Sequence, residues 1–253
     1  MTTTHFSCPS CQCTASSTDE RCLECGWRFD EMPDFRPTPV ARPRLPVMVE
    51  CAIAIDRTGS TNVFASGTLA MIREILHSIE PKVQSIKVWV QTHGDEDYGQ
   101  QPVLLTEDGD IEQAIADVQT IVFEGGGDPE EHHLDAIETA FQTIPWSNDR
   151  RRVRGVMICF LTADSKPSRK GLSPESIGGA ISKQGILLYV VSQRTPLVSA
   201  FCQAAKGMFV EISNDPSPDD IERIAAAIGA SIAATVATGK TTPIAAMAAT
   251  QSK

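Results

Sequence analysis

Hydroxyl and carboxylate side chains alternate immediately after the first apolar run of this 253-residue chain. The run ends at Ile55 and is followed by Asp56, Thr58 and Ser60, with Gly59 between the two hydroxyl residues. Glycine permits a tight turn, and side chains at alternate positions of such a turn converge on one point. Oxygen donors without cysteine or histidine among them suit Mg²⁺, Mn²⁺ or Ca²⁺ rather than zinc. We therefore predict a divalent cation site at this turn.

Two further loops supply carboxylates. The glycine-rich segment 125–131 reads GGGDPEE and brings Asp128, Glu130 and Glu131 to the start of a predicted helix, while Asp164 follows the third strong apolar run. Ligands of open α/β sheets bind where the strands end, so we predict Asp128, Glu131 and Asp164 as further metal ligands, with Glu130 as the alternative in its loop. An acidic residue after a strand is also often only a helix cap.

These residues resemble the metal-ion-dependent adhesion site of von Willebrand factor A (VWA) domains. The resemblance rests on the Asp56-x-Thr58-x-Ser60 motif, the GGGD loop and Asp164, and it spans roughly residues 47–236. It is closest to the bacterial and alpha-kinase-associated branch of that family. The GGGDPEE loop and the tryptophan ahead of the next strand are similar to features of that branch.

The resemblance implies a role for each residue. Thr58 and Ser60 would bind the ion directly through their hydroxyls, and Asp56 and Asp164 would bind it directly or through water. The second-loop ligand would come from the GGGD loop. There the chain departs from the branch, because Pro129 follows the aspartate without an intervening residue, and the choice among the acidic residues of the loop stays open.

Five of the eight cysteines lie within the first 25 positions. Cys8 and Cys11 form one CxxC pair, and Cys22 and Cys25 form a second pair after a spacing of ten residues, which resembles a short zinc ribbon. Two such pairs provide a tetrahedral thiolate shell for Zn²⁺. Cys13 is the alternative to Cys11. A pair of disulfides is the other interpretation, but the chain begins without a signal-peptide pattern, so we expect a reducing compartment.

From Val47 onward, short apolar runs alternate with amphipathic segments. The runs predict strands at 47–55, 86–92, 153–162, 186–192 and 208–212, with an antiparallel edge strand at 102–106. The amphipathic segments predict helices at 63–79, 110–119, 130–143, 174–183, 196–205 and 218–235. This order predicts an α/β fold with a doubly wound, mostly parallel, Rossmann-like sheet. Cys51, Cys159 and Cys202 fall inside these elements, where we expect them to be small buried apolar residues.

The composition changes along the chain predict four segments. We expect a zinc ribbon at 1–32, a Pro/Arg-rich linker at 33–46 that holds five prolines, the VWA domain at 47–236, and a flexible tail at 237–253. The GKTT sequence of the tail lacks the earlier glycine and the preceding strand of a phosphate-binding loop, so we reject that interpretation.

Charge restricts the partners. The 22 basic and 32 acidic residues leave a net charge of −10, which opposes unselective binding to nucleic acids and anionic lipids. No apolar run is long enough to span a bilayer. We therefore expect a cytoplasmic, non-enzymatic adaptor or scaffold that binds a protein partner's Asp or Glu through the cation, within a signalling, chaperone or defence assembly. The alternatives are a nucleic-acid-binding zinc ribbon with the VWA domain as an assembly platform, and a metal-dependent hydrolase.

Three other polar clusters have simpler interpretations. His93 and the acidic residues 95–97 predict a solvated loop, with an accessory cation site as the alternative. His132 and His133 are most simply exposed and half-exposed helix positions, although His93 and His132 are the bases that a hydrolase would need. The basic run at 150–154 predicts a solvated turn, with a contact to an acidic partner as the alternative.

Overall fold

The computed structural model describes residues 5–7, 13–16, 20, 21, 24, 28, 47–150, 152–213 and 216–238. The chain divides into two compact units, Met1–Leu45 and Pro46–Lys253. In the first unit, strand β1 (His5–Ser7) pairs antiparallel with β2 (Thr14–Ser16).

The predicted zinc ligands Cys8, Cys11, Cys22 and Cys25 lie outside the described residues, as does the linker 33–46, so zinc binding stays a prediction. Cys13 is described, and it is exposed and free of a disulfide.

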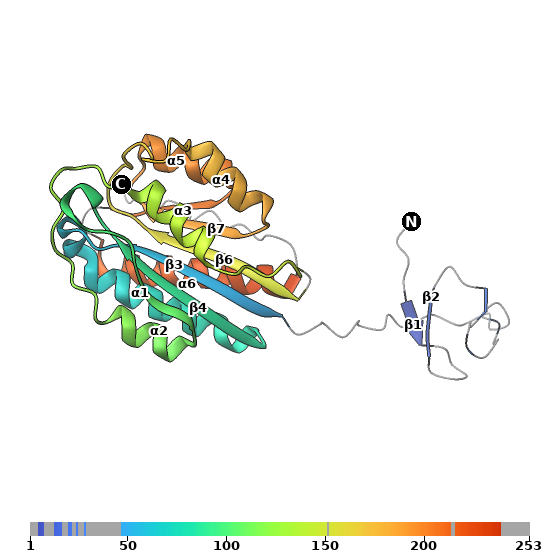
Figure 1. The fold of residues 1–253 in the computed structure, drawn as a ribbon. Coiled ribbons are helices and arrows are strands. Elements are labelled where there is room, and N and C mark those ends of the chain that lie inside the picture. Colours follow the sequence, from blue (N-terminus) through green and yellow to red (C-terminus); the bar gives the residue numbers. More distant parts are fainter. Residues whose placement is uncertain are drawn as a thin grey trace, which may run out of the picture. The chain divides into compact units, whose positions relative to one another are not determined.

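The second unit is built on one six-stranded sheet (Figure 1). Its strands are β3 (Met48–Asp56), β4 (Ser85–His93), β5 (Val103–Gly109), β6 (Val153–Phe160), β7 (Leu187–Ser192) and β8 (Met208–Glu211). Their spatial order is β5-β4-β3-β6-β7-β8, and β5 alone runs antiparallel to its neighbour. The predicted α/β class, the mostly parallel sheet and the antiparallel edge strand are confirmed.

Helices cover both faces of this sheet (Figure 1). They are α1 (Ala65–Ile79), α2 (Ile111–Val118), α3 (His133–Thr143), α4 (Pro174–Lys183), α5 (Pro196–Ala204) and α6 (Pro218–Thr238). Helices α1, α2 and α6 bury their apolar stripes in one core, and α3, α4 and α5 bury theirs in a second core on the opposite face. No helix in the described part of the chain has the length and hydrophobicity of a bilayer-spanning segment.

Strand β3 shows why the apolar runs are uninterrupted. Ile53 and Ile55 point into one core, whereas Ala52 and Ala54 point into the other, so both faces of the strand must be apolar. The interior cysteines follow the same pattern. As predicted, Cys51, Cys159 and Cys202 are buried in these cores.

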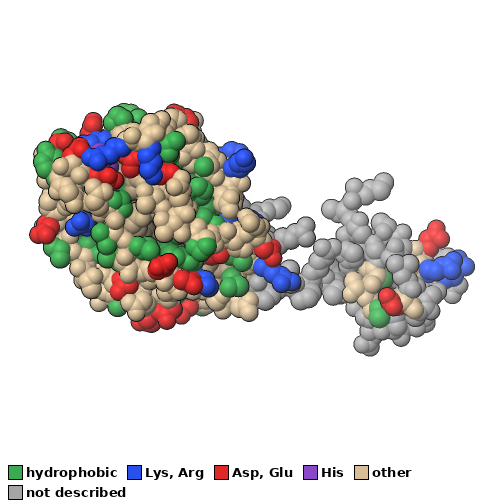
Figure 2. All heavy atoms as spheres, in the orientation of Figure 1, with side chains coloured by type: hydrophobic (Ala, Val, Ile, Leu, Met, Phe, Trp, Pro, Cys, Tyr) green, Lys and Arg blue, Asp and Glu red, His purple; other side chains and the backbone are tan. Residues whose placement is uncertain are grey.

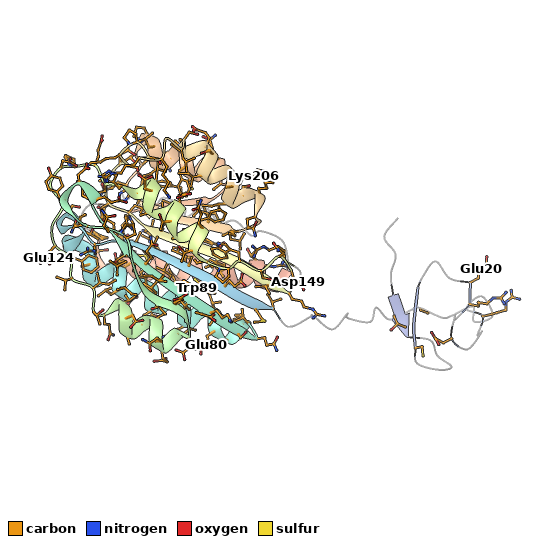
Figure 3. The ribbon with its side chains drawn as sticks, viewed as in Figure 1. Glu20, Glu80, Trp89, Glu124, Asp149 and Lys206 are labelled. Carbon is orange, nitrogen blue, oxygen red and sulfur yellow. The ribbon has the colours of Figure 1, made fainter. Side chains whose placement is uncertain are left out.

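The chain reverses its direction of winding between β3 and β6. From β3 it crosses through α1 to β4 on one side, and from β6 it crosses through α4 to β7 on the other side. The loops after β3 and β6 therefore diverge and leave a crevice at the edge where the parallel strands end, which we call the carboxyl edge. Figure 3 shows Glu124 at this end of the unit and Asp149 at the opposite end.

Two segments near this edge differ from the predicted elements. The predicted helix at 63–79 is preceded and partly replaced by a 3-10 segment, η2 (Gly59–Phe64). The predicted helix at 130–143 begins only at His133, because Glu131 pairs as a parallel bridge with Ser165 and is held in an extended conformation. Both differences place polar side chains at the carboxyl edge.

Candidate metal centre

Asp56, the last residue of β3, lies buried at the bottom of the site. Its Oδ1 accepts hydrogen bonds from the Thr58 backbone N–H at 2.9 Å and from the Thr58 hydroxyl at 2.8 Å. Its Oδ2 accepts a hydrogen bond from the Thr162 hydroxyl, which follows β6. Burial opposes ionisation of Asp56, but nearby His133 and His93 and the bonds from Thr162 and Thr58 lower its pKa. The carboxylate therefore links the loops on the two sides of the crevice.

Hydroxyl groups gather above this carboxylate. Thr58 Oγ1 lies 3.0 Å from Ser60 Oγ, and Ser60 Oγ lies 3.2 Å from Thr162 Oγ1. Thr61 Oγ1 adds a longer contact of 3.4 Å to Thr162. The structure thus brings together Asp56, Thr58 and Ser60, and it adds Thr162. The signal for Thr162 was its position at the end of the third strong apolar run, two residues before Asp164.

The GGGD loop closes over this cluster. Gly59 N–H donates to Gly125 O at 3.1 Å, and Gly125 and Gly126 adopt φ values of +81° and +80°. Residues with a Cβ rarely adopt this left-handed conformation, so glycine is required at both positions. The Gln100 side chain holds the loop from the other side, with its Oε1 accepting from Gly126 N–H at 3.0 Å and its Nε2 donating to Glu124 O at 2.6 Å.

Glu131 is the carboxylate that reaches the cluster from this loop. Its side chain is only 2% exposed, and its Oε2 has no hydrogen-bond partner among the described residues. Burial, together with the charges of Asp56 and Asp95, raises its pKa to about 8. A buried oxygen without a partner is costly, and a bound cation would remove that cost.

A pocket of about 420 Å³ opens between these groups. Its walls include Thr58, Ser60, Gly126, Asp128 and Glu131. Neutral hydroxyls and carboxylates are the donors that Mg²⁺, Mn²⁺ and Ca²⁺ prefer. Both the donor set and the unpartnered Glu131 oxygen fit a hard divalent cation.

The other acidic residues of the loop are placed differently. Asp128 lines the pocket, but its Oδ2 forms an ion pair with Lys166 Nζ at 3.1 Å. Glu130 is exposed and does not line the pocket. Among the acidic residues of the GGGD loop, Glu131 is therefore the one best placed to face a cation.

Asp164 lies outside the hydroxyl cluster. Its Oδ1 accepts hydrogen bonds from the backbone N–H groups of Ser165 at 2.9 Å, Leu197 at 3.1 Å and Val198 at 3.3 Å. Leu197 and Val198 are in the first turn of α5, whose own Thr195 makes no capping bond. In this structure Asp164 caps α5, and a role as a metal ligand, directly or through water, stays a prediction.

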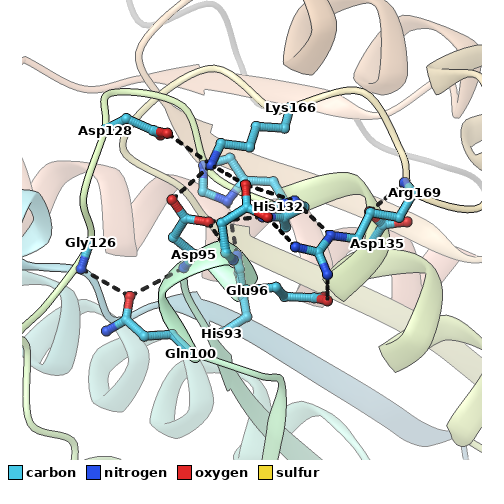
Figure 4. A network of polar contacts seen from close by, with 12 residues as sticks. His93, Asp95, Glu96, Gln100, Gly126, Asp128, His132, Asp135, Lys166 and Arg169 are labelled. Atoms are coloured by element: carbon cyan, nitrogen blue, oxygen red, sulfur yellow. Dashed lines mark hydrogen bonds and ion pairs between the residues drawn. The ribbon is translucent and has the colours of Figure 1, made fainter.

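A charged network borders the pocket (Figures 2 and 4). Figure 2 shows acidic and basic side chains gathered together at the upper left of the unit. Lys166 Nζ lies 2.8 Å from Asp95 Oδ2 and 2.9 Å from Asp97 Oδ2, in addition to its pair with Asp128 (Figure 4). Burial would lower the pKa of Lys166, but these three aspartates raise it. The predicted solvated loop is wrong for Asp95, which is fully buried.

Asp95, Asp97 and His132 are close enough together to hold a metal ion. The same groups already have cationic partners, because Lys166 pairs with both aspartates and Arg169 Nη2 donates to Asp97. Their negative charge is thus largely compensated. The acidic residues of this loop were identified from the sequence as a candidate accessory cation site. Their basic partners, which come from the loop after β6, were not identified.

His132 is buried, so the prediction of an exposed position is wrong. Its Nε2 accepts from Arg169 Nε at 3.0 Å, and its Nδ1 lies 3.1 Å from Asp95 Oδ1. Because Arg169 can only donate, the proton of the neutral ring is on Nδ1 and is donated to Asp95. Both ring nitrogens of His132 are therefore engaged.

His133 is also fully buried rather than half-exposed. His133 Nδ1 lies 2.9 Å from Nε2 of His93, and the two rings meet edge to face. His93 neighbours Asp56 across the β3–β4 pairing. Burial and the neighbouring His133 lower the pKa of His93 to about 3, and burial also lowers the pKa of His133. Both rings are therefore neutral at physiological pH and lie beneath the site.

The basic run at the opposite end is partly folded back onto the protein. Arg150 Nε donates to Gln184 O at 2.9 Å, and its Nη1 lies 3.8 Å from Glu50 Oε2. Arg152 is exposed, as a solvated turn would have it. The prediction of a fully solvated turn is thus wrong for Arg150.

No protein-family model matches the sequence, and the curated proteins contain no match either. Solved structures do match. The VWA domain of SpRpn10 is similar with a TM-score of 0.56 and 14% identity, over 70% of this chain and 94% of that chain. Proximal thread matrix protein 1 from the mussel byssus is similar with a TM-score of 0.53 and 14% identity, over 75% of this chain and 46% of that chain, so this chain spans less than half of its length. The chain has the VWA fold that the motif resemblance implies.

Proposed function

We propose that this VWA-fold chain is a non-enzymatic adaptor that captures an Asp or Glu side chain of a protein partner through a divalent cation. The observation that carries the proposal is Glu131. Its carboxylate is buried, lacks a partner for Oε2 among the described residues, and faces a pocket lined by the hydroxyls of Thr58 and Ser60. A cation there would satisfy the carboxylate and would remain open to an outside ligand.

Four residues would hold the ion. Thr58, Ser60 and Glu131 line the pocket, and Asp56 supports the hydroxyls from below. When bound, Mg²⁺, Mn²⁺ or Ca²⁺ supplies a positive charge at the base of the pocket. Because two of the direct donors are neutral hydroxyls, that charge is only partly cancelled, and a carboxylate from another protein is a favourable additional ligand.

The histidine geometry favours binding over hydrolysis. A single-metal hydrolase needs a base that can reach a substrate in the pocket. His93 is fully buried and hydrogen-bonded to His133, and both nitrogens of His132 are engaged by Asp95 and Arg169. None of these imidazoles lines the pocket.

The cellular setting belongs to the proposal as well. We place the protein in the cytoplasm, within a signalling, chaperone or defence assembly, with a Zn²⁺-bound ribbon at Cys8, Cys11, Cys22 and Cys25 as a second contact surface. The net charge of −10 supports a protein partner over nucleic acid.

Calorimetric titration of Mg²⁺ and Mn²⁺ into the full chain tests the metal site. We expect Glu131→Gln and Ser60→Ala each to weaken Mg²⁺ binding at least tenfold, because each removes an oxygen donor or its charge. Glu130→Gln is the matched control, since Glu130 is the adjacent, exposed glutamate outside the pocket. Equal Mg²⁺ binding by Glu131→Gln and the wild-type chain would contradict the proposed site.

Affinity capture with matched baits tests the adaptor role. The wild-type and Glu130→Gln chains should retain the same partner in Mg²⁺ and release it in EDTA, while Glu131→Gln should retain none. The double variant Asp56→Ala/Ser60→Ala should behave like Glu131→Gln, with circular dichroism checking that it folds. A partner that binds all baits equally in EDTA would refute cation-dependent recognition.

A further inference from the structure

A second hollow adjoins the metal pocket at the carboxyl edge. It has a volume of about 340 Å³, and we call it the side groove. Its walls include Arg57, Val103, Leu105, Val122 and Glu124. Arg57 and Glu124 line the side groove, and the next residues in the chain, Thr58 and Gly125, line the metal pocket. The two hollows therefore share a wall.

Apolar side chains are exposed around these two hollows. Val103 and Val122 line the side groove and are 43% and 61% exposed. Tyr98 is 57% exposed, and its ring lies against Gly127, which lines the metal pocket. In the described part of the chain these three are the exposed large hydrophobic residues. Such clustering is typical of an interaction site.

Arg57 gives the side groove an unused hydrogen-bond donor. Its backbone is held in place, with its N–H donating to His93 O at 2.8 Å and its carbonyl accepting from Glu124 N–H at 3.0 Å. Its side-chain Nε is nevertheless buried without a hydrogen-bond partner among the described residues. A buried N–H without an acceptor is energetically unfavourable, so an acceptor on a bound molecule would stabilise it. Glu124 supplies an acceptor in the same groove, so the pair matches the C=O and N–H of a peptide main chain.

We infer that the side groove binds the residues next to the captured acidic residue of the partner, and that it selects an extended segment with a large apolar side chain there. The inference rests on the proposed cation-dependent capture. The apolar side chain would pack on Val103 and Val122, and a main-chain carbonyl would accept from Arg57. Because consecutive residues line the two hollows and an extended chain advances about 3.4 Å per residue, the apolar side chain falls within about three residues of the acidic one.

Panning a phage-displayed library of random 12-residue peptides against the full chain in Mg²⁺ tests this inference. The enriched peptides should contain Asp or Glu and a large apolar residue at a constant spacing. For a synthetic enriched peptide, we expect Val122→Asp in the protein, or Ala in place of the peptide's apolar residue, to weaken binding about tenfold. Gln203→Glu adds the same charge at an exposed position of α5 that lines neither hollow, and it should leave binding unchanged.

The outcomes separate the side groove from the metal site. Mg²⁺-dependent peptides without a spaced apolar residue, or with unchanged affinity for Val122→Asp, would overturn the side groove and leave cation-dependent capture intact. Peptides that bind equally in EDTA, or a failure to enrich any peptide, would overturn the proposed function itself. Sedimentation could instead show that the chain dimerises and that Val122→Asp weakens the dimer. In that case the occupant of the side groove would be a second copy of this chain and not a partner peptide, and the inference would be overturned. Mg²⁺ titration and thermal unfolding of Val122→Asp check that the metal site and fold are retained.

Discussion

At the scale of single residues, two buried groups at the site shift stability in opposite directions with pH. Glu131 has a pKa raised to about 8, so between its ordinary value of 4.5 and 8 the folded chain keeps a proton that the unfolded chain has released, and stability falls as pH rises. His93 has a pKa lowered to about 3, so below about 6.5 only the unfolded chain takes up its proton, and stability falls as pH falls. A cation at Glu131 would remove the first effect and leave the second.

The buried histidine pair gives a direct spectroscopic prediction. We expect the ring nitrogens of His93 to keep the ¹⁵N shifts of neutral imidazole at pH 5, where a histidine with an ordinary pKa is mostly protonated. Arg57, Asp56 and His133 are the charged or titratable groups that act on His93. In a Glu131→Gln background, the urea midpoint should also fall between pH 7 and pH 5. The urea-unfolded chain is the control, and imidazolium shifts in the folded chain at pH 5 would contradict the prediction.

At the scale of elements, the apolar runs were sufficient to predict the sheet and its helices, because β3 and its neighbours bury both faces. The predicted start of the third helix was wrong, since residues 130–132 are acidic residues and a histidine that carry no apolar pattern to mark a helix start, and Glu131 instead pairs with Ser165. A helix cap was the alternative role for an acidic residue such as Asp164, but the sequence did not indicate that α5 is the helix it caps. The cap lies in the loop after β6, far along the chain from the α5 amides it binds, and local sequence carries no signal for such a contact.

Replacing Asp164 separates a capping role from a metal-binding role. Asp164→Ala should lower the free energy of unfolding by about 1 kcal/mol, as expected for loss of a helix cap, and should leave Mg²⁺ affinity nearly unchanged. Asp110→Ala is the matched control, because Asp110 Oδ1 caps α2 by accepting from Gln113 N–H at 2.8 Å. Urea unfolding and Mg²⁺ calorimetry measure the two effects. A tenfold loss of Mg²⁺ affinity in Asp164→Ala alone would restore the ligand role that the family resemblance implies.

At the scale of the whole molecule, the acidic residues beside the metal pocket differ from those inside it in whether they have a basic partner. The chain carries a net charge of −10, yet the acidic residues beside the metal pocket are matched by Lys166 and Arg169. The carboxylates of Glu131 and Asp56 have no such cationic side chain bonded to them among the described residues. Carboxyl groups without a basic partner thus lie together where a divalent cation would bind and would displace the proton of Glu131.

The cysteine-rich first unit leads to a prediction about zinc. The purified full chain should contain one zinc per molecule by elemental analysis, and Cys8→Ser and Cys22→Ser should each abolish it, because a tetrahedral site needs all four thiolates. Cys13→Ser is the matched control and should keep its zinc, since Cys13 is a surplus, exposed thiol. Zinc loss in Cys13→Ser but not in Cys11→Ser would show that Cys13, and not Cys11, is the zinc ligand. Absence of zinc from the wild-type chain would refute the ribbon.

The backbone around Glu131 also has a mechanical consequence. Glu131 N–H donates to Asp164 O at 3.1 Å, and Glu131 O accepts from Lys166 N–H at 2.7 Å, so its main chain is clamped to the loop that follows β6. The side chain of Asp164 in turn holds the first turn of α5. A displacement of the Glu131 main chain would have to break these bonds or move the loop after β6, which holds α5 through Asp164. Hydrogen bonds thereby connect the pocket to α5 in the outer helical layer. We therefore expect a backbone movement caused by ion binding at the carboxyl edge to be transmitted to α5.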